Sequence, residues 1–496
     1  MSVSFGTNVL KLLSSKIATQ AISFITGPII ARIFLPEHFG TVQLFSSISG
    51  VIIVISCLRY DLSIPLGRDK NEVIASFIIS VISTLAIALL SFVSMLILKE
   101  KVAVWLKSPE LETFLWFLPL AVLLGGVGSA IRYYASRSGK FGAMAWADFG
   151  SVSGSIFITI TFGLIFGASA KFLFIGQIAG MILNILILFI FLSREFLSEV
   201  RTINLSLRDI WEVAKYHKKF PIYDTWGGLF NSISGQLPPI ILGAYFSTTV
   251  VGYYSLGNRF VGLPMALLGG SIAQVFFPVA SKEYNETGRL NNIVSSTFKR
   301  LVQIGIFPMM VLGILGAPIF GFVFGPNWLE AGIYSQILSF WMFLVLITSP
   351  LSANFAVLDR QGTGLAFNTG LISSRLLALL LGSQTGQPRI ALIAFVVVSV
   401  IGWIFMLLWI LYNSHVSIKW GLKELLKYML LSLVLLLPAF FIFRMQHNID
   451  TMLIAIVFAI IIYFFALYRF EQSIRLYING ILTQLSGIIL CKKAKN

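Results

Sequence analysis

Long apolar stretches separated by short polar segments run along almost the whole chain. Each stretch is close to or above the roughly 20 residues that a helix needs to cross a bilayer. The pattern therefore predicts an all-α polytopic membrane protein. We expect fourteen transmembrane helices, at about residues 7–33, 40–66, 73–98, 113–135, 142–166, 171–192, 220–246, 250–280, 298–324, 331–357, 364–382, 390–412, 425–443 and 451–468.

Composition leads to the same class of protein. Of the 496 residues, 57% are apolar and 11% are charged. A soluble domain has about 25% charged residues, so the composition excludes a water-soluble protein. The first stretch has no compact basic segment and no small-residue cleavage site, and it continues through Pro28 to Arg32. We therefore expect a retained helix there rather than a signal peptide.

Lysine and arginine residues are distributed unevenly between alternate loops. The even-numbered loops and the C-terminal tail hold 23 of them, whereas the odd-numbered loops hold 6. Short cytoplasmic loops carry an excess of basic residues, so both termini are predicted to be cytoplasmic. The formal charge of +16 is thereby explained by topology. Nucleic acid is not expected as a partner, because its binding needs basic residues clustered on a water-facing surface.

This orientation can be measured by cysteine labelling. In a background without Cys57 and Cys491, a cysteine placed at Asn327 should react with an impermeant thiol reagent added outside, because its loop is poor in basic residues. A cysteine at Asn204 lies in a basic loop and should be protected. Reversed labelling would contradict the predicted orientation.

The longest polar interruption divides the chain into six helices and eight. Leu205, Leu207, Ile210 and Trp211 alternate there with charged residues, a pattern typical of an amphipathic helix at the membrane interface. The predicted organisation is an N-terminal lobe (1–192), a cytoplasmic amphipathic linker (193–219), a C-terminal lobe (220–412), two additional transmembrane helices (413–470) and a basic interfacial tail (471–496).

A weak internal repeat supports two related halves. The segment around Pro28 and Gly40 recurs around Pro239 and Gly252, with an offset of 211 residues at the prolines and 212 at the glycines. Both copies end on a short outer loop. Transporters are often built from such repeats and hold the substrate at the interface between them.

Several ionisable residues fall inside the predicted spans, where each is a candidate for function because a charge at the bilayer centre is costly. The candidates for binding substrate are Lys16, Arg32, Arg59, Arg259 and Arg375, and the candidates for ion coupling are Asp61, Asp148 and Asp224.

The five cations outnumber the three acids, so pairing within the set cannot neutralise it. Guanidinium groups bind phosphate oxygens in bidentate geometry, and a pyrophosphate-bearing substrate would supply the missing negative charge. We expect Arg59, Arg259 and Arg375 to face one central lumen. The alternative for Arg32, Arg59 and Arg132 is that they lie near helix ends and reach the interface.

Other chemistry finds little support in the sequence. The two cysteines form no disulfide framework, and the four histidines have no metal-ligand spacing. No Walker A string is present, so ATP hydrolysis by this chain is not expected. A membrane-embedded glycan enzyme is the chemical alternative. Because the longest outer loop, residues 99–112, is too short for a catalytic domain, we expect no enzyme activity. We also expect no metal and no cofactor.

Three strings are similar to landmarks of one transporter family. They are LPEHFG at 35–40, RYDLSIPL at 59–66 followed by Asp69, and VGYYSL at 251–256 followed by Arg259, Pro264 and Phe277-Pro278. Together they resemble the polysaccharide transporter family, the Wzx-type oligosaccharide flippases of the multidrug/oligosaccharidyl-lipid/polysaccharide superfamily.

The resemblance implies two pseudo-symmetric lobes around a central cavity and no catalysis. It further implies transport of an undecaprenyl-diphosphate-linked oligosaccharide from the cytoplasmic to the periplasmic face of a bacterial inner membrane. Such a substrate would be a repeat unit of O-antigen (lipopolysaccharide), capsule or exopolysaccharide. In relatives, cations of the first, second and eighth helices line the cavity, and Lys16, Arg32, Arg59 and Arg259 hold comparable places here. The expected partners are this lipid-linked glycan, membrane lipids and a polysaccharide polymerase with its chain-length machinery.

Two questions stay open at this point. A cation-coupled multidrug antiporter of the same superfamily is the alternative function, which the surplus of intramembrane cations disfavours. The energy source is expected to be a proton or sodium gradient or the membrane potential, with Asp224 as a candidate for bridging the two halves in one state.

Overall fold

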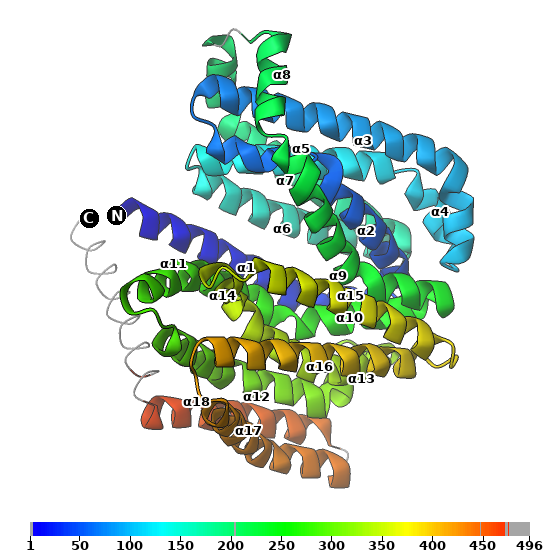
Figure 1. Cartoon of the computed structure of the whole chain (residues 1–496). Helices are drawn as coiled ribbons and strands as arrows, with labels where there is room; N and C mark the ends of the chain where they lie inside the picture. Colours follow the sequence, from blue (N-terminus) through cyan, green and yellow to red (C-terminus); the bar gives the residue numbers. More distant parts are fainter. Residues whose placement is uncertain (1–2, 203–204, 447, 472–474, 476–496) are drawn as a thin grey trace, which may run out of the picture. The chain divides into compact units, whose positions relative to one another are not determined.

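The computed structural model describes residues 3–202, 205–446, 448–471 and 475, and within these ranges it contains helices and no strand (Figure 1). The α-helices are α1 (Val3–Ile33), α2 (Pro36–Ser56), α3 (Lys70–Trp105), α4 (Pro109–Leu115), α5 (Leu118–Arg137), α6 (Phe141–Phe166), α7 (Ala170–Thr202), α8 (Leu207–Tyr216), α9 (Thr225–Tyr245), α10 (Thr248–Val261), α11 (Gly270–Thr287), α12 (Asn291–Val323), α13 (Leu329–Thr348), α14 (Asn354–Val357), α15 (Gln361–Ser383), α16 (Pro388–Asn413), α17 (Ile418–Gln446) and α18 (Ile449–Phe470). Cys491 and the predicted interfacial tail, apart from Glu471 and Arg475, lie outside the described residues.

The predicted class, an all-α polytopic membrane protein, is confirmed. In the described part of the chain, 11 helical segments are long and apolar enough to cross a membrane. The three remaining predicted spans are helical but are more polar or divided into shorter helices. They correspond to α1, to the short π-helix η2 (Phe220–Asp224) with α9, and to α10 with α11. Polar residues in these helices have to be satisfied inside the protein, because lipid offers them no hydrogen bonds.

The predicted second span, residues 40–66, is too long. Helix α2 ends at Ser56, and Leu58 and Arg59 adopt left-handed backbone angles, with φ of 46° and 62°. Such angles cost roughly 1–2 kcal/mol for a residue with a Cβ, and they interrupt the helix. Arg59 and Asp61, which were predicted inside the second helix, therefore lie in the turn after it and in the short 3-10 helix η1 (Tyr60–Leu66).

The chain forms two compact units. The first comprises residues 1–259, 323–334 and 375–395, and the second comprises residues 260–322, 335–374 and 396–496. Packing thus groups α9 and most of α10 with the helices that precede the predicted linker. This grouping follows contacts, whereas the predicted lobes follow chain order, and the lobe boundaries stay a prediction.

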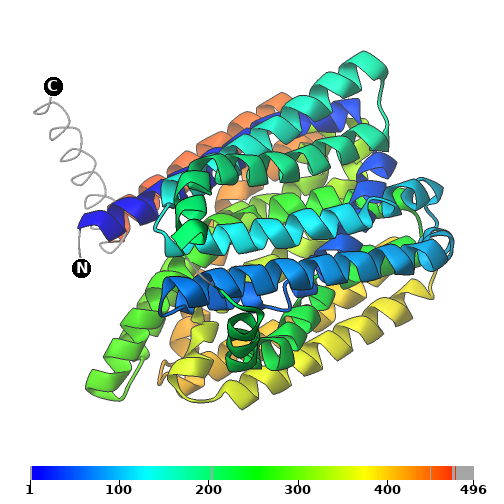
Figure 2. The ribbon, with the colours of Figure 1, turned by 90° about the horizontal axis from the view of Figure 1, so that it is seen from above.

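A buried core holds the long helices of the first unit together. Ile74, Tyr134, Ala147 and Leu188, from α3, α5, α6 and α7, are each at most 2% exposed. Helices α6 and α7 lie side by side (Figures 1 and 2). They come close because Gly180 has no side chain: an added Cβ would lie 3.1 Å from the carbonyl oxygen of Ser151.

The predicted linker contains the amphipathic helix α8. A capping box begins this helix. The amide of Asp209 donates to Ser206 Oγ at 3.2 Å, and the amide of Ser206 donates to Asp209 Oδ2 at 2.8 Å. Hydrogen bonds from Ser206 lower the pKa of the Asp209 carboxyl below its usual value. Leu207 and Trp211 are strongly exposed on this helix, as the interfacial position that we predict for it requires.

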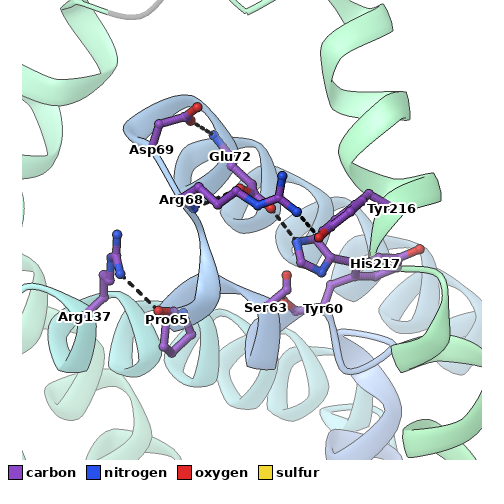
Figure 3. A network of polar contacts seen from close by, with 9 residues as sticks. All are labelled: Tyr60, Ser63, Pro65, Arg68, Asp69, Glu72, Arg137, Tyr216 and His217. Atoms are coloured by element: carbon purple, nitrogen blue, oxygen red, sulfur yellow. Dashed lines mark hydrogen bonds and ion pairs between the residues drawn. The ribbon is translucent and has the colours of Figure 1, made fainter.

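Polar contacts fix the end of α8 to the start of α3 (Figure 3). Arg68 donates to the hydroxyl of Tyr216, and His217 Nε2 lies 2.9 Å from Glu72 Oε1. The hydroxyl of Tyr60 donates to a backbone carbonyl of α8 at 3.1 Å. The turn that follows α2 is therefore held between α3 and α8.

In the second unit, Glu471 joins three helices at one end. Its carboxylate lies 2.7 Å from Lys299 Nζ of α12 and 2.7 Å from Lys427 Nζ of α17, and it directly follows α18. The hydroxyl of Tyr428 also donates to it, at 2.5 Å. Burial by itself would raise the pKa of Glu471, but the hydrogen bonds from the two lysines and the tyrosine outweigh burial and lower the pKa to about 2.

Glu471→Gln is expected to lower the free energy of unfolding by about 2 kcal/mol at pH 7, because two lysines lose their shared partner. The ordinary pKa is 4.5, so the stabilisation should be complete above that pH and should fall as the pH drops towards 2. Thermal unfolding of the detergent-purified protein at several pH values measures the difference. Glu286→Gln, at an exposed carboxylate of α11, is the control. A stability difference between the wild type and Glu471→Gln that does not change with pH would contradict the lowered pKa of Glu471.

Candidate substrate cavity

A cavity of about 720 Å³ lies within the first unit. Residues of α1, α2, α5, α6, α7 and α10 line it, so helices from the start and the middle of the chain both contribute. Its volume is typical of sites for small organic ligands, which are about 300–1,000 Å³.

The lining is rich in neutral polar groups. Three amides and seven hydroxyls face the cavity: Gln43, Gln177, Asn184, Ser23, Ser46, Ser129, Ser151, Ser155, Thr159 and Ser255. Some bind one another, since Ser46 donates to Gln177 Oε1 at 3.1 Å and Ser255 donates to Gln43 Oε1 at 3.0 Å. Amides and hydroxyls both donate and accept, so this wall can bind the hydroxyl groups of a sugar.

Two arginines line the same cavity. Arg132 of α5 forms a bidentate ion pair with Asp148 of α6, with Nη1–Oδ1 at 2.6 Å and Nη2–Oδ2 at 2.8 Å. Arg259 of α10 is exposed, and within the described residues it takes part in no ion pair. The charge of Arg132 is therefore compensated by Asp148, whereas that of Arg259 is not, so the cavity can attract an anion.

The other predicted cations lie outside this lining. Lys16 and Arg32 are exposed on α1, and Arg32 Nε donates to the carbonyl of Val323 at 3.3 Å. Arg59 lies against α9, where a Cβ on Gly228 would be 3.5 Å from its Nε. Arg375 is buried with its guanidinium 5.3 Å from the ring centre of Phe395. The prediction that Arg59, Arg259 and Arg375 face one central lumen stays a prediction.

The three candidate acids occupy different surroundings. Asp148 binds Arg132 at the cavity, as described above. Asp61 is 4% exposed and lies behind the wall, where Ser129 Oγ donates to its Oδ2 at 2.6 Å. Asp224 is exposed just before α9. Two of the three acids are thus connected to the cavity through one face of α5, because Ser129 and Arg132 are three residues apart.

Arg132 is the charged lining residue that is absent from the predicted substrate-binding residues. Its place near the end of a predicted span favours the alternative position at the membrane interface. The spacing of Gly125, Gly128, Ser129 and Arg132 gives the missing signal. Residues three, four and seven positions apart share a helix face, and a face of small and polar residues does not suit lipid.

Comparison with known sequences identifies the family. A family model described as "Polysaccharide biosynthesis protein" matches residues 29–333. The succinoglycan biosynthesis transport protein ExoT of Rhizobium meliloti (strain 1021) is 24% identical over 339 residues, which are 64% of this chain and 62% of ExoT. The teichuronic acid biosynthesis protein TuaB of Bacillus subtilis (strain 168) is 21% identical over 177 residues, 36% of each chain. The matches thus span less than two thirds of either relative.

Solved structures identify the fold. The lipid II flippase MurJ in an inward closed conformation gives a TM-score of 0.68 at 15% identity, covering 95% of this chain and 99% of MurJ. An inward-facing multidrug resistance MATE family transporter of the MOP superfamily gives 0.62 at 15% identity, covering 84% and 95%. The resemblance found in the sequence motifs is confirmed: the chain belongs to the polysaccharide biosynthesis protein family and has the helical fold of MurJ and MATE transporters.

Proposed function

We propose that the protein is a flippase that moves a lipid-linked oligosaccharide across the membrane by alternating access. The observation that carries the proposal is the first unit's cavity, which combines an uncompensated arginine, Arg259, with a wall of amides and hydroxyls. A sugar attached to a lipid through a diphosphate presents both kinds of partner, hydroxyl groups and negative charge. The family, named for polysaccharide biosynthesis, supports the same substrate class.

The finer assignments are part of this proposal. The lipid is undecaprenyl diphosphate, and the glycan is a repeat unit of exopolysaccharide, capsule or O-antigen; the name of ExoT, a succinoglycan transport protein, favours the first. The direction is from the cytoplasmic to the periplasmic face of a bacterial inner membrane, with both termini cytoplasmic. The energy source is a proton or sodium gradient or the membrane potential, and a polymerase acts on the delivered glycan.

A multidrug antiporter is the second candidate, favoured by the similarity to a MATE transporter structure. Sites for cationic drugs need uncompensated acids, whereas the acid beside this cavity, Asp148, is already paired with Arg132. The two functions differ in the sign of charge that the cavity accepts.

Transport in reconstituted vesicles tests the proposal. A fluorescent farnesyl-diphosphate-linked saccharide in the inner leaflet becomes accessible to an impermeant quencher only after it has crossed the membrane. Vesicles with the protein should expose it faster than protein-free vesicles, and an imposed proton gradient or potential should increase the rate. Accumulation of a cationic dye without movement of the saccharide would overturn the proposal in favour of the antiporter.

A further inference from the structure

The ion pair between Arg132, which lines the cavity, and Asp148 is only partly buried. Arg132 and Asp148 belong to different helices, and their side chains are 37% and 22% exposed. Neither side chain is therefore fully buried, and Arg132 lines the cavity. Separating them should cost less than separating a fully buried pair, since the free energy of desolvation that such a pair must offset falls with exposure.

The second cation of the cavity, Arg259, helps an anion to compete with Asp148 for Arg132. Arg259 lines the same cavity, and no carboxylate is among the lining residues that the structure describes. An anion drawn towards Arg259 meets a second guanidinium whose bidentate partner is a single carboxylate. Phosphate oxygens match that planar fork as well as a carboxylate does, so the anion can replace Asp148 on Arg132.

We infer that Arg132 is a substrate-binding residue held at rest by Asp148, and that a diphosphate entering the cavity displaces Asp148 and binds Arg132 together with Arg259. This inference rests on the proposed function and extends it to the residues that take the diphosphate. Asp148 then acts as a positioning residue: it keeps the guanidinium oriented along the wall, and it sets a threshold that a neutral or weakly charged lipid does not pass.

If the diphosphate displaces Asp148, substitutions of Asp148 and of Arg132 should change the affinity for the diphosphate in opposite directions. In Asp148→Asn the resting carboxylate is lost and Arg132 is free, so affinity for a diphosphate should increase about fivefold. In Arg132→Gln the binding group is lost, so affinity should decrease about tenfold, which corresponds to about 1.4 kcal/mol. The double variant should behave like Arg132→Gln, because Asp148 acts only through Arg132.

Binding to the purified protein measures these effects. The probe is farnesyl-diphosphate-linked glucose, and farnesyl glucoside without the diphosphate is the neutral control, whose affinity should not change. Unfolding temperatures establish that each variant is folded. If Arg132→Gln does not fold, Arg132→Lys replaces it, since lysine keeps the charge but loses the bidentate fork; its affinity should fall by about threefold.

Three results would overturn the inference: both single variants weaken binding, neither changes it, or the wild type does not prefer the diphosphate to the neutral probe. The vesicle assay separates this failure from that of the function. If Asp148→Asn flips normally and its affinity for the diphosphate is unchanged, the displacement of Asp148 is contradicted and the flippase function stands. Opposite shifts in affinity without flipping by the wild type would keep the exchange and remove the flippase.

Discussion

Gly252→Leu is expected to abolish transport, and Gly252→Ala to reduce it at least tenfold. Gly252 of α10 lies directly against the backbone of α2: an added Cβ would be 1.8 Å from the carbonyl oxygen of Pro36. Gly40 of α2 has the converse contact, since its Cβ would be 1.7 Å from the carbonyl oxygen of Thr248. Neither distance is compatible with a carbon atom, so either substitution must push the two helices apart.

The reciprocity of this crossing follows from the internal repeat. Gly40 and Gly252 are 212 residues apart, and so are Pro36 and Thr248, the residues that they contact. Each glycine thus meets the position four residues before the other. Trp328 packs beside the crossing, with ring centres 4.9 Å from Phe39 and 6.4 Å from Tyr253. We expect a close contact of two backbones beside a buried tryptophan to close one end of the transport path.

The measurement is flipping of the farnesyl-diphosphate-linked saccharide in vesicles. Gly235→Ala in α9 is the matched control, because a Cβ there meets nothing within 4 Å, and it should transport at the wild-type rate. Unfolding temperatures separate a displaced crossing from a misfolded protein. Wild-type flipping by Gly252→Ala would contradict the requirement for close approach.

Hydropathy predicted the helices well because membrane insertion selects for length and apolarity, and both are visible in one sequence. It failed at the end of α2, where apolar residues continue through Leu62 and Ile64 although the helix stops at Ser56. No glycine or asparagine marks the left-handed turn at Leu58 and Arg59. Tertiary contacts, such as that of Tyr60 with α8, determine this turn, and a residue window does not contain them.

The sequence does not predict the partners of the charges that it places inside the membrane. Asp148 pairs with Arg132 on the preceding long helix, and Arg375 packs on Phe395. Such contacts depend on which helices are neighbours and how each is rotated, and a single sequence gives only the face that a residue shares with its own helix. The face of Arg132 was readable, whereas its pairing with Asp148 was not.

Helix α10 connects the cavity to the glycine crossing. Arg259 and Gly252 are seven residues apart, which places them on one face of the helix at a separation of about 10 Å along its axis. Ser255, between them, donates to Gln43 of α2 at 3.0 Å. An anion bound at Arg259 therefore acts on the same rigid element that forms the crossing, so binding and closure can be coupled through α10.

Arg259→Gln is expected to reduce flipping of the diphosphate-linked saccharide at least tenfold. The cavity then keeps Arg132, which Asp148 compensates, and loses the charge that first attracts the anion. Loss of one charge-assisted hydrogen-bond donor costs about 1.5–3 kcal/mol, which corresponds to about ten- to a hundredfold in affinity.

Arg259→Lys should retain part of the rate as a point charge, and the effect should appear at limiting substrate. Arg289→Gln, at an exposed arginine before α12, is the control and should flip normally. A wild-type rate in Arg259→Gln at limiting substrate would show that the diphosphate is bound elsewhere, and the cavity of the first unit would lose its role in transport.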